Sequence, residues 1–532
     1  MEIIDFVYSQ SGFRGVSSIL NNTVFEGIKQ YLSRGGTREV SWQEFRAVFS
    51  NDLYDLKKVA LYFSQKLSEQ EYQYYQKKMN VNSVMKYPSR FIQVRCTDLN
   101  LIFQKPKTLP KRKLGSYSVT PFEPESTIEI KDFLTMHYYQ LWVKNKISAN
   151  LNKGVKRLIV HLPTGSGKTR TANELVCEKL NSGEAGSVIL WVCHSVELCA
   201  QAEVSLTRLL RYRAQRVVNV VPFYSTAKEL LIDKEKVNIV YLTYGKLNSY
   251  RKKYGLSTLA SITRIVIVDE AHKVLAPTYA QVISEVLSFG ADLIGLTATP
   301  GRGNIDNQIM NKALAAYFYS NLISYKEFNA SNLFQLLTEE GYLARIDHEV
   351  LIHSGSFRLE NEALRKFSKS GFIPGEALDE LSSNFSRNDE ILGRIRQLIR
   401  AGKQRILVFA ASTEHAKILI ALLNYGKINA ALVLGDTPQE DRQVIYGKFK
   451  DGSINVIVNF GVLTTGFDEP KLDVCLIARP CSSPVLYSQM VGRALRGSKN
   501  GGNDKNLIID VSDNFVGMPE LDQLFIRWNL NY

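Results

Sequence analysis

The chain has 532 residues, which is more than one hydrophobic core usually supports. Of these residues 45% are hydrophobic and 22% are charged, a composition that excludes a disordered or fibrous protein. No stretch approaches the roughly 18 uninterrupted apolar residues of a membrane span, and the N-terminus lacks a secretion-signal pattern, so we expect a cytoplasmic protein that does not contact membranes. The formal net charge of +14 favours a polyanionic partner, and nucleic acid is the usual one.

Residues 1–104 have the pattern of a mostly helical domain. Ser41-Trp42-Gln43-Glu44 is a capping box, and Phe45 and Val48 follow it on one helical face. Residues 105–127 contain four prolines and five basic residues, which predicts an extended linker. We therefore expect residues 1–104 to form a separate accessory domain that holds a protein partner and takes no part in catalysis.

Residues 128–330 alternate short apolar runs with helix-forming stretches, and residues 331–532 repeat this rhythm. The runs are RLIVHLP, SVILWVCHS, NIVYLTY, RIVIVDE and DLIGLTATP in the first part, and QRILVFAAS, INAALVLG, INVIVNFGVL, DVCLIARP and KNLIIDVS in the second. Short Val- and Ile-rich runs separated by crossover helices predict a parallel sheet covered on both faces. The fold class is therefore α/β, with two tandem parallel-sheet domains. Residues 336–350 read as a connector that enters an edge strand of the second domain.

The segment HLPTGSGKTRTANELV, residues 161–176, predicts a phosphate site. It ends a strand, makes a glycine-rich turn and begins a helix, so backbone N–H groups converge where the helix dipole favours an anion. Lys168 is expected to reach the β and γ phosphates of ATP, and the Thr169 hydroxyl to ligate Mg²⁺. The residues expected to hold the nucleotide here are Thr164, Gly165, Ser166, Gly167, Lys168 and Thr169.

The run RIVIVDEAHK, residues 264–273, predicts the second half of the site. It delivers two carboxylates to the C-terminal end of a strand, where open parallel sheets bind their ligands. Asp269 is expected to hold Mg²⁺ through water. Glu270 is expected to orient and deprotonate the water that attacks the γ phosphate.

Four motifs together resemble the set of helicase superfamily 2 in its DEAH form. They are the glycine-rich turn, Val268–His272, Leu296–Pro300 and Gln489–Arg496, in this order along the chain. The resemblance implies two RecA-like domains that bind ATP in the cleft between them and nucleic acid across their top. It assigns further ATP contacts to Gln140, Gly466, Asp468, Gln489, Arg493 and Arg496, and coupling between the sites to His272, Thr297 and Thr299.

Three stretches of the second half, VFAASTEHA (residues 408–416), LGDTPQEDR (434–442) and residues 459–496, resemble the RadD-like, XPB-like and restriction-motor group, which acts mostly on DNA. DEAD-box proteins that remodel RNA usually carry His where Gln489 stands, and spliceosomal DEAH proteins usually carry glycine where Leu495 stands, so DNA is favoured over RNA. The resemblance places nucleic-acid contacts at Ser195, Thr243, Gly435 and Thr464. Two alternatives stay open: an ATP-driven switch subunit of a repair or defence complex that never unwinds DNA, and an RNA-stimulated ATPase.

Overall fold

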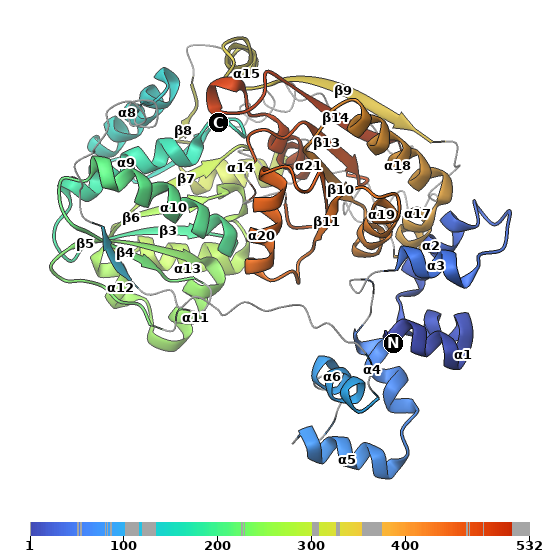
Figure 1. Cartoon of the computed structure of the whole chain (residues 1–532). Helices are drawn as coiled ribbons and strands as arrows, with labels where there is room; N and C mark the ends of the chain where they lie inside the picture. The colour runs from blue at the N-terminus through green and yellow to red at the C-terminus, as the bar shows by residue number, and fades with distance from the viewer. Residues whose placement is uncertain are drawn as a thin grey trace.

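The computed structural model describes residues 2–512 except for several short segments. These segments are 50–52, 54–55, 80, 82, 84, 86–87, 100, 102–115, 120–134, 225–226, 228, 300–307, 326–329, 354–374, 464–466, 468 and 482–483. The described part of the chain forms two α/β halves and a group of N-terminal helices (Figure 1). None of its helices is long and apolar enough to cross a bilayer.

The first half is built on an eight-stranded sheet with the order β1-β4-β5-β3-β6-β7-β2-β8. All neighbouring strands run parallel except β1, which pairs with β4 in the antiparallel direction. The strands are β1 (Tyr117–Val119), β2 (Arg157–His161), β3 (Val188–Cys193), β4 (Val218–Pro222), β5 (Val237–Thr243), β6 (Thr263–Asp269), β7 (Asp292–Thr297) and β8 (Leu322–Ile323).

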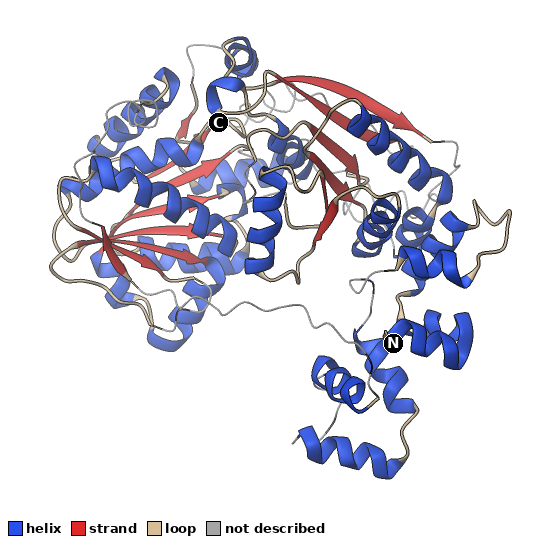
Figure 2. Ribbon diagram, viewed as in Figure 1, coloured by secondary structure: helices blue, strands red, loops and turns tan. Residues whose placement is uncertain are grey.

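Helices cover both faces of this sheet (Figure 2), as the crossovers of parallel strands require. They are α8 (Tyr138–Asn152), α9 (Lys168–Ser182), α10 (Val196–Arg213), α11 (Tyr244–Tyr254), α12 (Ser257–Ile262), α13 (Pro277–Leu287) and α14 (Gln308–Tyr317), and α15 (Ala330–Glu339) leads into the second half.

The second half is a six-stranded parallel sheet with the order β11-β12-β10-β13-β14-β9. The predicted edge strand is confirmed, because β9 pairs only with β14 and ends the sheet. The strands are β9 (Arg345–Ile352), β10 (Ile406–Ala410), β11 (Ala430–Val433), β12 (Val456–Asn459), β13 (Val474–Ala478) and β14 (Lys505–Ser512); the helices are α17 (Gly375–Ser383), α18 (Phe385–Arg400), α19 (Thr413–Tyr425), α20 (Gln439–Lys450) and α21 (Pro484–Val491).

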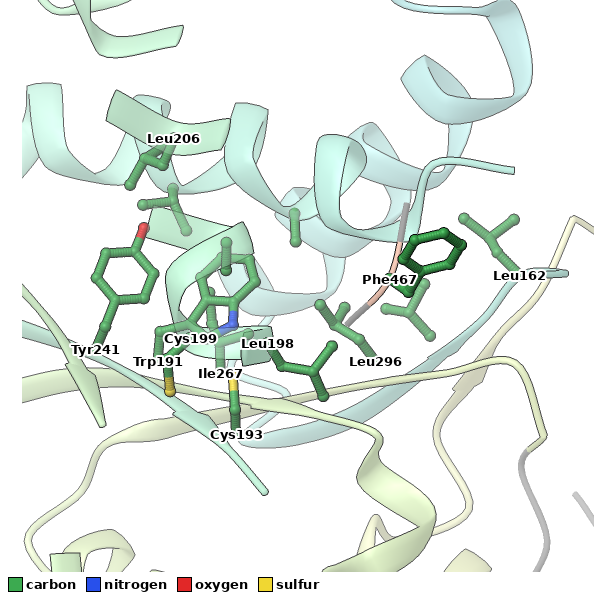
Figure 3. Packing of buried hydrophobic residues seen from close by; sticks show 14 of the residues in the cluster. Leu162, Trp191, Cys193, Leu198, Cys199, Leu206, Tyr241, Ile267, Leu296 and Phe467 are labelled. Carbon is green, nitrogen blue, oxygen red and sulfur yellow. The ribbon is translucent and has the colours of Figure 1, made fainter. Parts of the chain in front are cut away.

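The two halves share a buried core that crosses their boundary. One cluster contains Trp191 and Leu162 of the first half and also Phe467 and Leu495 of the second. Figure 3 shows part of this cluster, with Phe467 among the residues of the first sheet and its helices. Apolar contact across the boundary holds the two sheets at a defined position relative to each other.

The N-terminal helices are α1 (Ile3–Ile19), α2 (Asn22–Leu32), α3 (Trp42–Val48), α4 (Leu56–Gln65), α5 (Glu69–Met79) and α6 (Pro88–Asp98). Of the N-terminal helices, α2 and α3 pack on the second half. The capping box at Ser41 and Glu44 is confirmed. However, α2 contacts α17, α18 and α19, and the buried residues of the helices belong to the same cluster as Ile418 and Leu422. The first helices thus share a buried cluster with the second half, and the boundary of a separate domain at residue 104 stays a prediction.

The predicted linker also contains a strand of the first sheet. Tyr117–Val119 forms β1 at the sheet edge, and the Tyr117 hydroxyl donates to the Glu203 carboxylate at 2.6 Å. The sequence of this segment has no alternating apolar run, so only its tertiary pairing with β4 makes it a strand. Residues 105–115 and 120–127 of the predicted linker lie outside the described residues.

The contact between α2 and α19 depends on a glycine. A Cβ atom at Gly27 would lie 2.4 Å from Cδ1 of Ile418 and 3.5 Å from Cα of Ser383. We expect Gly27→Leu to push α2 away and to destabilise the protein by about 1–3 kcal/mol, the usual cost of overpacking. The matched control is Gly393→Ala in α18, where the space is open and the better helix former should stabilise by about 0.5–1 kcal/mol. Thermal unfolding measures both, and equal midpoints for Gly27→Leu and the unaltered protein would contradict this contact.

Candidate ATPase site and nucleic-acid edge

The glycine-rich turn lies between β2 and α9, as predicted. Gly165 and Gly167 both have φ of +84°, a left-handed conformation that favours glycine. The Ser166 hydroxyl donates to the Pro163 carbonyl at 2.7 Å and fixes the turn from inside. The first turn of α9, which begins at Lys168, therefore follows two glycines whose backbone can approach a phosphate closely.

Lys168 faces the acidic end of β6. Burial lowers the pKa of its ammonium group, and the negative charges of Glu270 and Asp269 act in the opposite direction. The Nζ atom lies 3.4 Å from the Pro163 carbonyl oxygen. The positive charge of Arg493, from the second half, also acts on this lysine. Cations from both halves and two carboxylates thus converge at one place.

Asp269 and Glu270 occupy different environments although they are neighbours. Asp269 is buried at the end of β6, where its Oδ1 accepts from the Glu270 backbone N–H at 2.9 Å. Burial, followed by the charge of Glu270, raises the pKa of Asp269 to about 7. Burial alone would raise the pKa of Glu270, but the charges of His272 and Lys168 outweigh it and the pKa is lowered. The two neighbouring carboxylates therefore differ, and Glu270 has the lower pKa of the pair.

Glu270 also has a strained backbone. Its φ and ψ are both 53°, the left-handed region that a non-glycine residue rarely adopts. This conformation ends β6 and begins the short 3₁₀-helix η3 (Ala271–Lys273). Strain of this kind persists where the surrounding structure imposes it, often at a functional site.

His272 lies between the acidic pair and the end of β7, as the predicted coupling requires. Its Nδ1 is 3.4 Å from Oε2 of Glu270 and 3.2 Å from Oγ1 of Thr297. The Thr299 hydroxyl lies 3.4 Å from the same nitrogen, and its backbone N–H donates to Oγ1 of Thr297. The imidazole ring of His272 therefore connects Glu270 to the segment after β7, so that a displacement of Glu270 would also displace this segment. Pro300, the last residue of that motif, lies outside the described residues.

The second half contributes the segment from α21 to the 3₁₀-helix η4 (Gly492–Ala494). A Cβ atom at Gly492 would lie 2.4 Å from Cγ2 of Thr164, so only glycine lets this segment touch the glycine-rich turn. The Arg493 guanidinium donates to the carbonyls of Gln489 and Phe467. The Gln489 amide nitrogen is buried and has no hydrogen-bond partner within the part of the chain that the structure describes. An orphaned buried donor beside a phosphate-type turn fits a bound triphosphate.

Gln140 contacts the glycine-rich turn in a way that the sequence did not indicate. Its Nε2 donates to the Ser166 carbonyl at 3.0 Å, and its Oε1 accepts from the His137 backbone N–H at 3.1 Å. The Tyr139 hydroxyl donates to the same carbonyl at 2.7 Å. The N-terminus of α8 thus holds the turn in place, and adenine reading by Gln140 stays a prediction.

Two further residues near Glu270 were missed in the sequence. His194 follows β3, and burial together with the charge of Lys273 lowers its pKa to about 4. Lys273 is itself largely buried, which lowers its pKa, and it faces Glu270 and Asp269. Lys273 could have been found from its position directly after the acidic motif. For His194 the only sequence signal was its position at the end of a predicted strand.

The predicted nucleic-acid contacts of the first half lie together. Ser195 follows β3 and Thr243 is the last residue of the adjacent strand β5; each caps the next helix by accepting a backbone N–H, from Leu198 and Lys246 respectively. The predicted contact of the second half, Gly435, lies in the turn after β11, where a Cβ atom would meet nothing within 4 Å. These three sites lie at C-terminal ends of strands, the ligand edge of parallel sheets.

The remaining predicted site residues are placed by their burial and backbone position, or lie outside the described residues. Thr169 lies half-buried in the first turn of α9, and Arg496 is half-buried with its backbone bridged to Leu343. Thr464, Gly466 and Asp468 lie outside the described residues.

Two segments match known families. Residues 133–302 match the family described as "Type III restriction enzyme, res subunit", and residues 390–498 match "Helicase conserved C-terminal domain". The first match covers the half with the glycine-rich turn and the acidic pair, and the second covers Gln489 and Arg493.

Curated relatives resemble the chain over the same region. The ATP-dependent helicase IRC3 of Saccharomyces cerevisiae is 25% identical over 360 residues, which is 65% of this chain and 47% of IRC3. The mitochondrial ATP-dependent helicase irc3 of Schizosaccharomyces pombe is 27% identical over 410 residues, 73% of this chain and 59% of that protein. The EcoKI endonuclease subunit, a type I restriction enzyme of Escherichia coli, is 22% identical over 436 residues, 74% of this chain and 36% of the subunit.

A solved structure supports the fold. Dbp5 of S. cerevisiae, bound to RNA and ADP BeF3, superposes with a TM-score of 0.51 at 15% identity, covering 75% of this chain and 88% of Dbp5. The fold is thus that of a tandem RecA-like protein. The chain belongs to the superfamily 2 helicases, with restriction-enzyme subunits among its relatives, and this class implies the use of ATP.

Proposed function

We propose that the protein is an ATP-dependent DNA helicase or double-strand DNA translocase. The observation that carries this proposal is the contact of Gly492 with Thr164, because it places the segment of Gln489 and Arg493 next to the phosphate turn, where the charge of Arg493 acts on Lys168. A site completed only by contact between two halves can convert nucleotide turnover into movement of those halves.

Each charged residue has a distinct role in this proposal. Lys168 binds the β and γ phosphates, while Thr169 and Asp269 would hold Mg²⁺, which supplies charge neutralisation when bound. Glu270 takes a proton from the attacking water, and its lowered pKa keeps it ionised for this task. Arg493 donates to developing charge on the phosphate oxygens. When the phosphate leaves, a shift of the Glu270 side chain would move His272, and His272 contacts Thr297 and Thr299.

DNA is the proposed substrate because Gln489 and Leu495 depart from the motifs usual in RNA-remodelling proteins. Similarity to a restriction enzyme subunit supports the same choice. Similarity to proteins described as RNA helicases supports the alternative of an RNA-stimulated ATPase. A protein partner is proposed for residues 1–104, because none of their described residues reaches the ATP site.

The test is the ATPase rate with single-stranded, duplex and forked DNA and with RNA of matched length. We expect stimulation by at least one DNA and less by RNA. Strand displacement by the isolated chain separates a helicase from a translocase or a switch. ATP hydrolysis that no nucleic acid stimulates would contradict the proposal, and stimulation by RNA alone would replace DNA with RNA.

DNA affinity should fall steeply with salt. The contacts at Ser195, Thr243 and Gly435 would be to phosphates and sugars, so counterion release by basic residues supplies most of the affinity. With six to ten phosphate contacts, affinity would fall roughly 10³- to 10⁵-fold between 50 and 200 mM salt. Fluorescence anisotropy with two unrelated duplexes measures the slope. A strong preference for one sequence that persists at high salt would contradict backbone binding.

A further inference from the structure

An arginine and a phenylalanine meet at the ligand edge of the second sheet. Arg479 directly follows β13 and Phe460 directly follows β12, and these two strands lie on either side of β10. The Cζ atom of Arg479 lies 5.0 Å from the centroid of the Phe460 ring, a cation–π contact. The two side chains therefore meet across the C-terminal end of β10, at the edge where open parallel sheets bind their ligands.

The guanidinium group of Arg479 has little within the chain to compensate its charge. It is half-buried, and within the part of the chain that the structure describes it donates to no carbonyl or side chain and no carboxylate acts on its pKa. Burial lowers this pKa, and the ionisable neighbour that acts in the opposite direction is the Cys481 thiol. A cation removed from water costs free energy unless an anion or hydrogen-bond acceptors meet it. The five N–H donors of this group therefore suit an anion that the chain itself does not supply.

The backbone before each of these two residues is fixed by buried polar contacts. Arg387 of α18 is fully buried, and its Nη2 donates at 3.0 Å to the carbonyl of Ala478, the residue before Arg479. The side-chain amide of Asn459, the residue before Phe460, donates to the carbonyl of Val408 in β10 at 2.9 Å. Both strand ends are thus held in place, as a preformed binding site requires.

The pair also lies beside the predicted nucleic-acid contact of the second half. β11 pairs with β12, and Val433 lies opposite Asn459 at the ends of these strands. Gly435 follows Val433 by two residues and Phe460 follows Asn459 directly, so both lie just beyond the ends of neighbouring strands, which are about 4.8 Å apart. A strand of nucleic acid that lies along this edge would therefore meet the turn of Gly435 and the guanidinium group of Arg479 together.

We propose that Arg479 binds a backbone phosphate of nucleic acid and that Phe460 orients the guanidinium group for this contact. This inference rests on the proposed function and adds a charged contact to it. A guanidinium group binds phosphate through two parallel N–H groups at its edge. Stacking on an aromatic ring uses the flat face of the group and leaves that edge free. The contact carries no sequence information, because it reaches no base.

ATP is the other source of phosphate in this protein. Among the described residues, the charges that act on Lys168 are those of Glu270, Asp269 and Arg493, and Arg479 is not one of them. The second half therefore already presents Arg493 to the nucleotide site. This difference favours nucleic acid as the ligand of Arg479, and the experiment below separates the two sources.

The salt dependence of DNA affinity tests the inference, because it counts phosphate contacts. Fluorescence anisotropy of a labelled duplex with the full chain gives the slope of log affinity against log salt concentration. In Arg479→Gln, this slope should become smaller by about 0.9, the value for one phosphate contact on duplex DNA. Affinity at low salt should fall at least about tenfold, the loss of a hydrogen bond to a charged group. Arg479→Leu, whose apolar side chain suits a half-buried position, should give the same change and serves if the glutamine variant does not fold.

Two further variants separate charge from orientation. Phe460→Leu keeps the cation, so the slope should stay unchanged while affinity falls about two- to fivefold, the size of a cation–π contact. The matched control is Arg400→Gln, which removes the same charge from the last turn of α18, ahead of β10 and so at the opposite edge of the sheet. Its slope should equal that of the unaltered protein. Melting midpoints confirm that each variant is folded.

Failure of this inference can be told apart from failure of the proposed function. An unaltered protein that binds no nucleic acid at low salt would overturn the proposed function itself. An unaltered protein that binds DNA, together with an Arg479→Gln variant of unchanged slope and affinity, would overturn only the phosphate contact. Loss of binding to a fluorescent ATP analogue in Arg479→Gln, with an unchanged DNA slope, would overturn it in favour of the nucleotide. An equal decrease of the slope in Arg400→Gln would also overturn it, since the decrease would then come from net charge.

Discussion

Replacing Lys168 with alanine should nearly abolish ATP binding. The ammonium group is buried and faces Glu270 and Asp269 at the first turn of α9; Lys273 also faces these carboxylates but belongs to η3, not to the phosphate turn. Truncating one partner of a buried charge contact costs roughly 2–5 kcal/mol, which corresponds to a loss of affinity on the order of 30- to 3,000-fold. Binding of a fluorescent ATP analogue measures this loss. Lys179→Ala, near the end of the same helix, is the control and should bind normally.

Glu270→Gln should separate binding from turnover. The amide keeps the shape of the side chain but cannot take a proton, so hydrolysis should fall roughly 10²- to 10⁴-fold, the usual contribution of a general base. ATP and DNA binding should persist, because Lys168 and the nucleic-acid edge are intact. Single-turnover hydrolysis with saturating DNA measures the rate, and Glu184→Gln, on the exposed surface, is the control. Hydrolysis at the normal rate by Glu270→Gln would exclude this carboxylate as the base.

The nucleotide turn and the acidic pair could be predicted from the sequence because their information is local. Two glycines at fixed spacing, then a lysine, impose the turn between β2 and α9. A run of β-branched residues ends at Asp269, so strand and carboxylate are encoded in the same stretch. The confirmed positions of the turn between β2 and α9 and of Asp269 at the end of β6 needed no knowledge of distant contacts, and their roles stay predictions.

The missed features depend on contacts between distant residues. β4, which none of the predicted apolar runs includes, contains the polar residue Asn219. The side-chain amide of Asn219 donates to Oδ1 of Asn238 in β5 at 2.8 Å, so this buried amide finds its partner on the neighbouring strand. Gln140 contacts Ser166, and Arg442 contacts Glu197, across separations that no local pattern records. The mostly helical character of residues 1–104 could be predicted, but the surface that α2 covers could not, because nothing in the local sequence shows that Ile418 lies against Gly27.

Removal of the N-terminal helices should destabilise the second half, contrary to what the proline-rich segment alone suggests. A fragment that begins at Phe122 loses α2, whose buried Phe25 and Ile28 belong to one cluster with Ile418 and Leu422. Each large apolar side chain contributes about 1.5–3 kcal/mol when buried. The loss of several approaches the whole stability of a domain, roughly 5–15 kcal/mol.

We therefore expect this fragment to melt at least about 10 °C lower than the full chain or to aggregate, since about 1 kcal/mol shifts the midpoint by roughly 2–4 °C in a domain of this size. A second fragment that begins at Ser116 keeps β1 and its bond from Tyr117 to Glu203. If the helices are responsible, both fragments should fail alike; if β1 is responsible, only the shorter one should. A fragment from Phe122 with the same midpoint as the full chain would contradict the shared core and would support the interpretation of residues 1–104 as an independent domain.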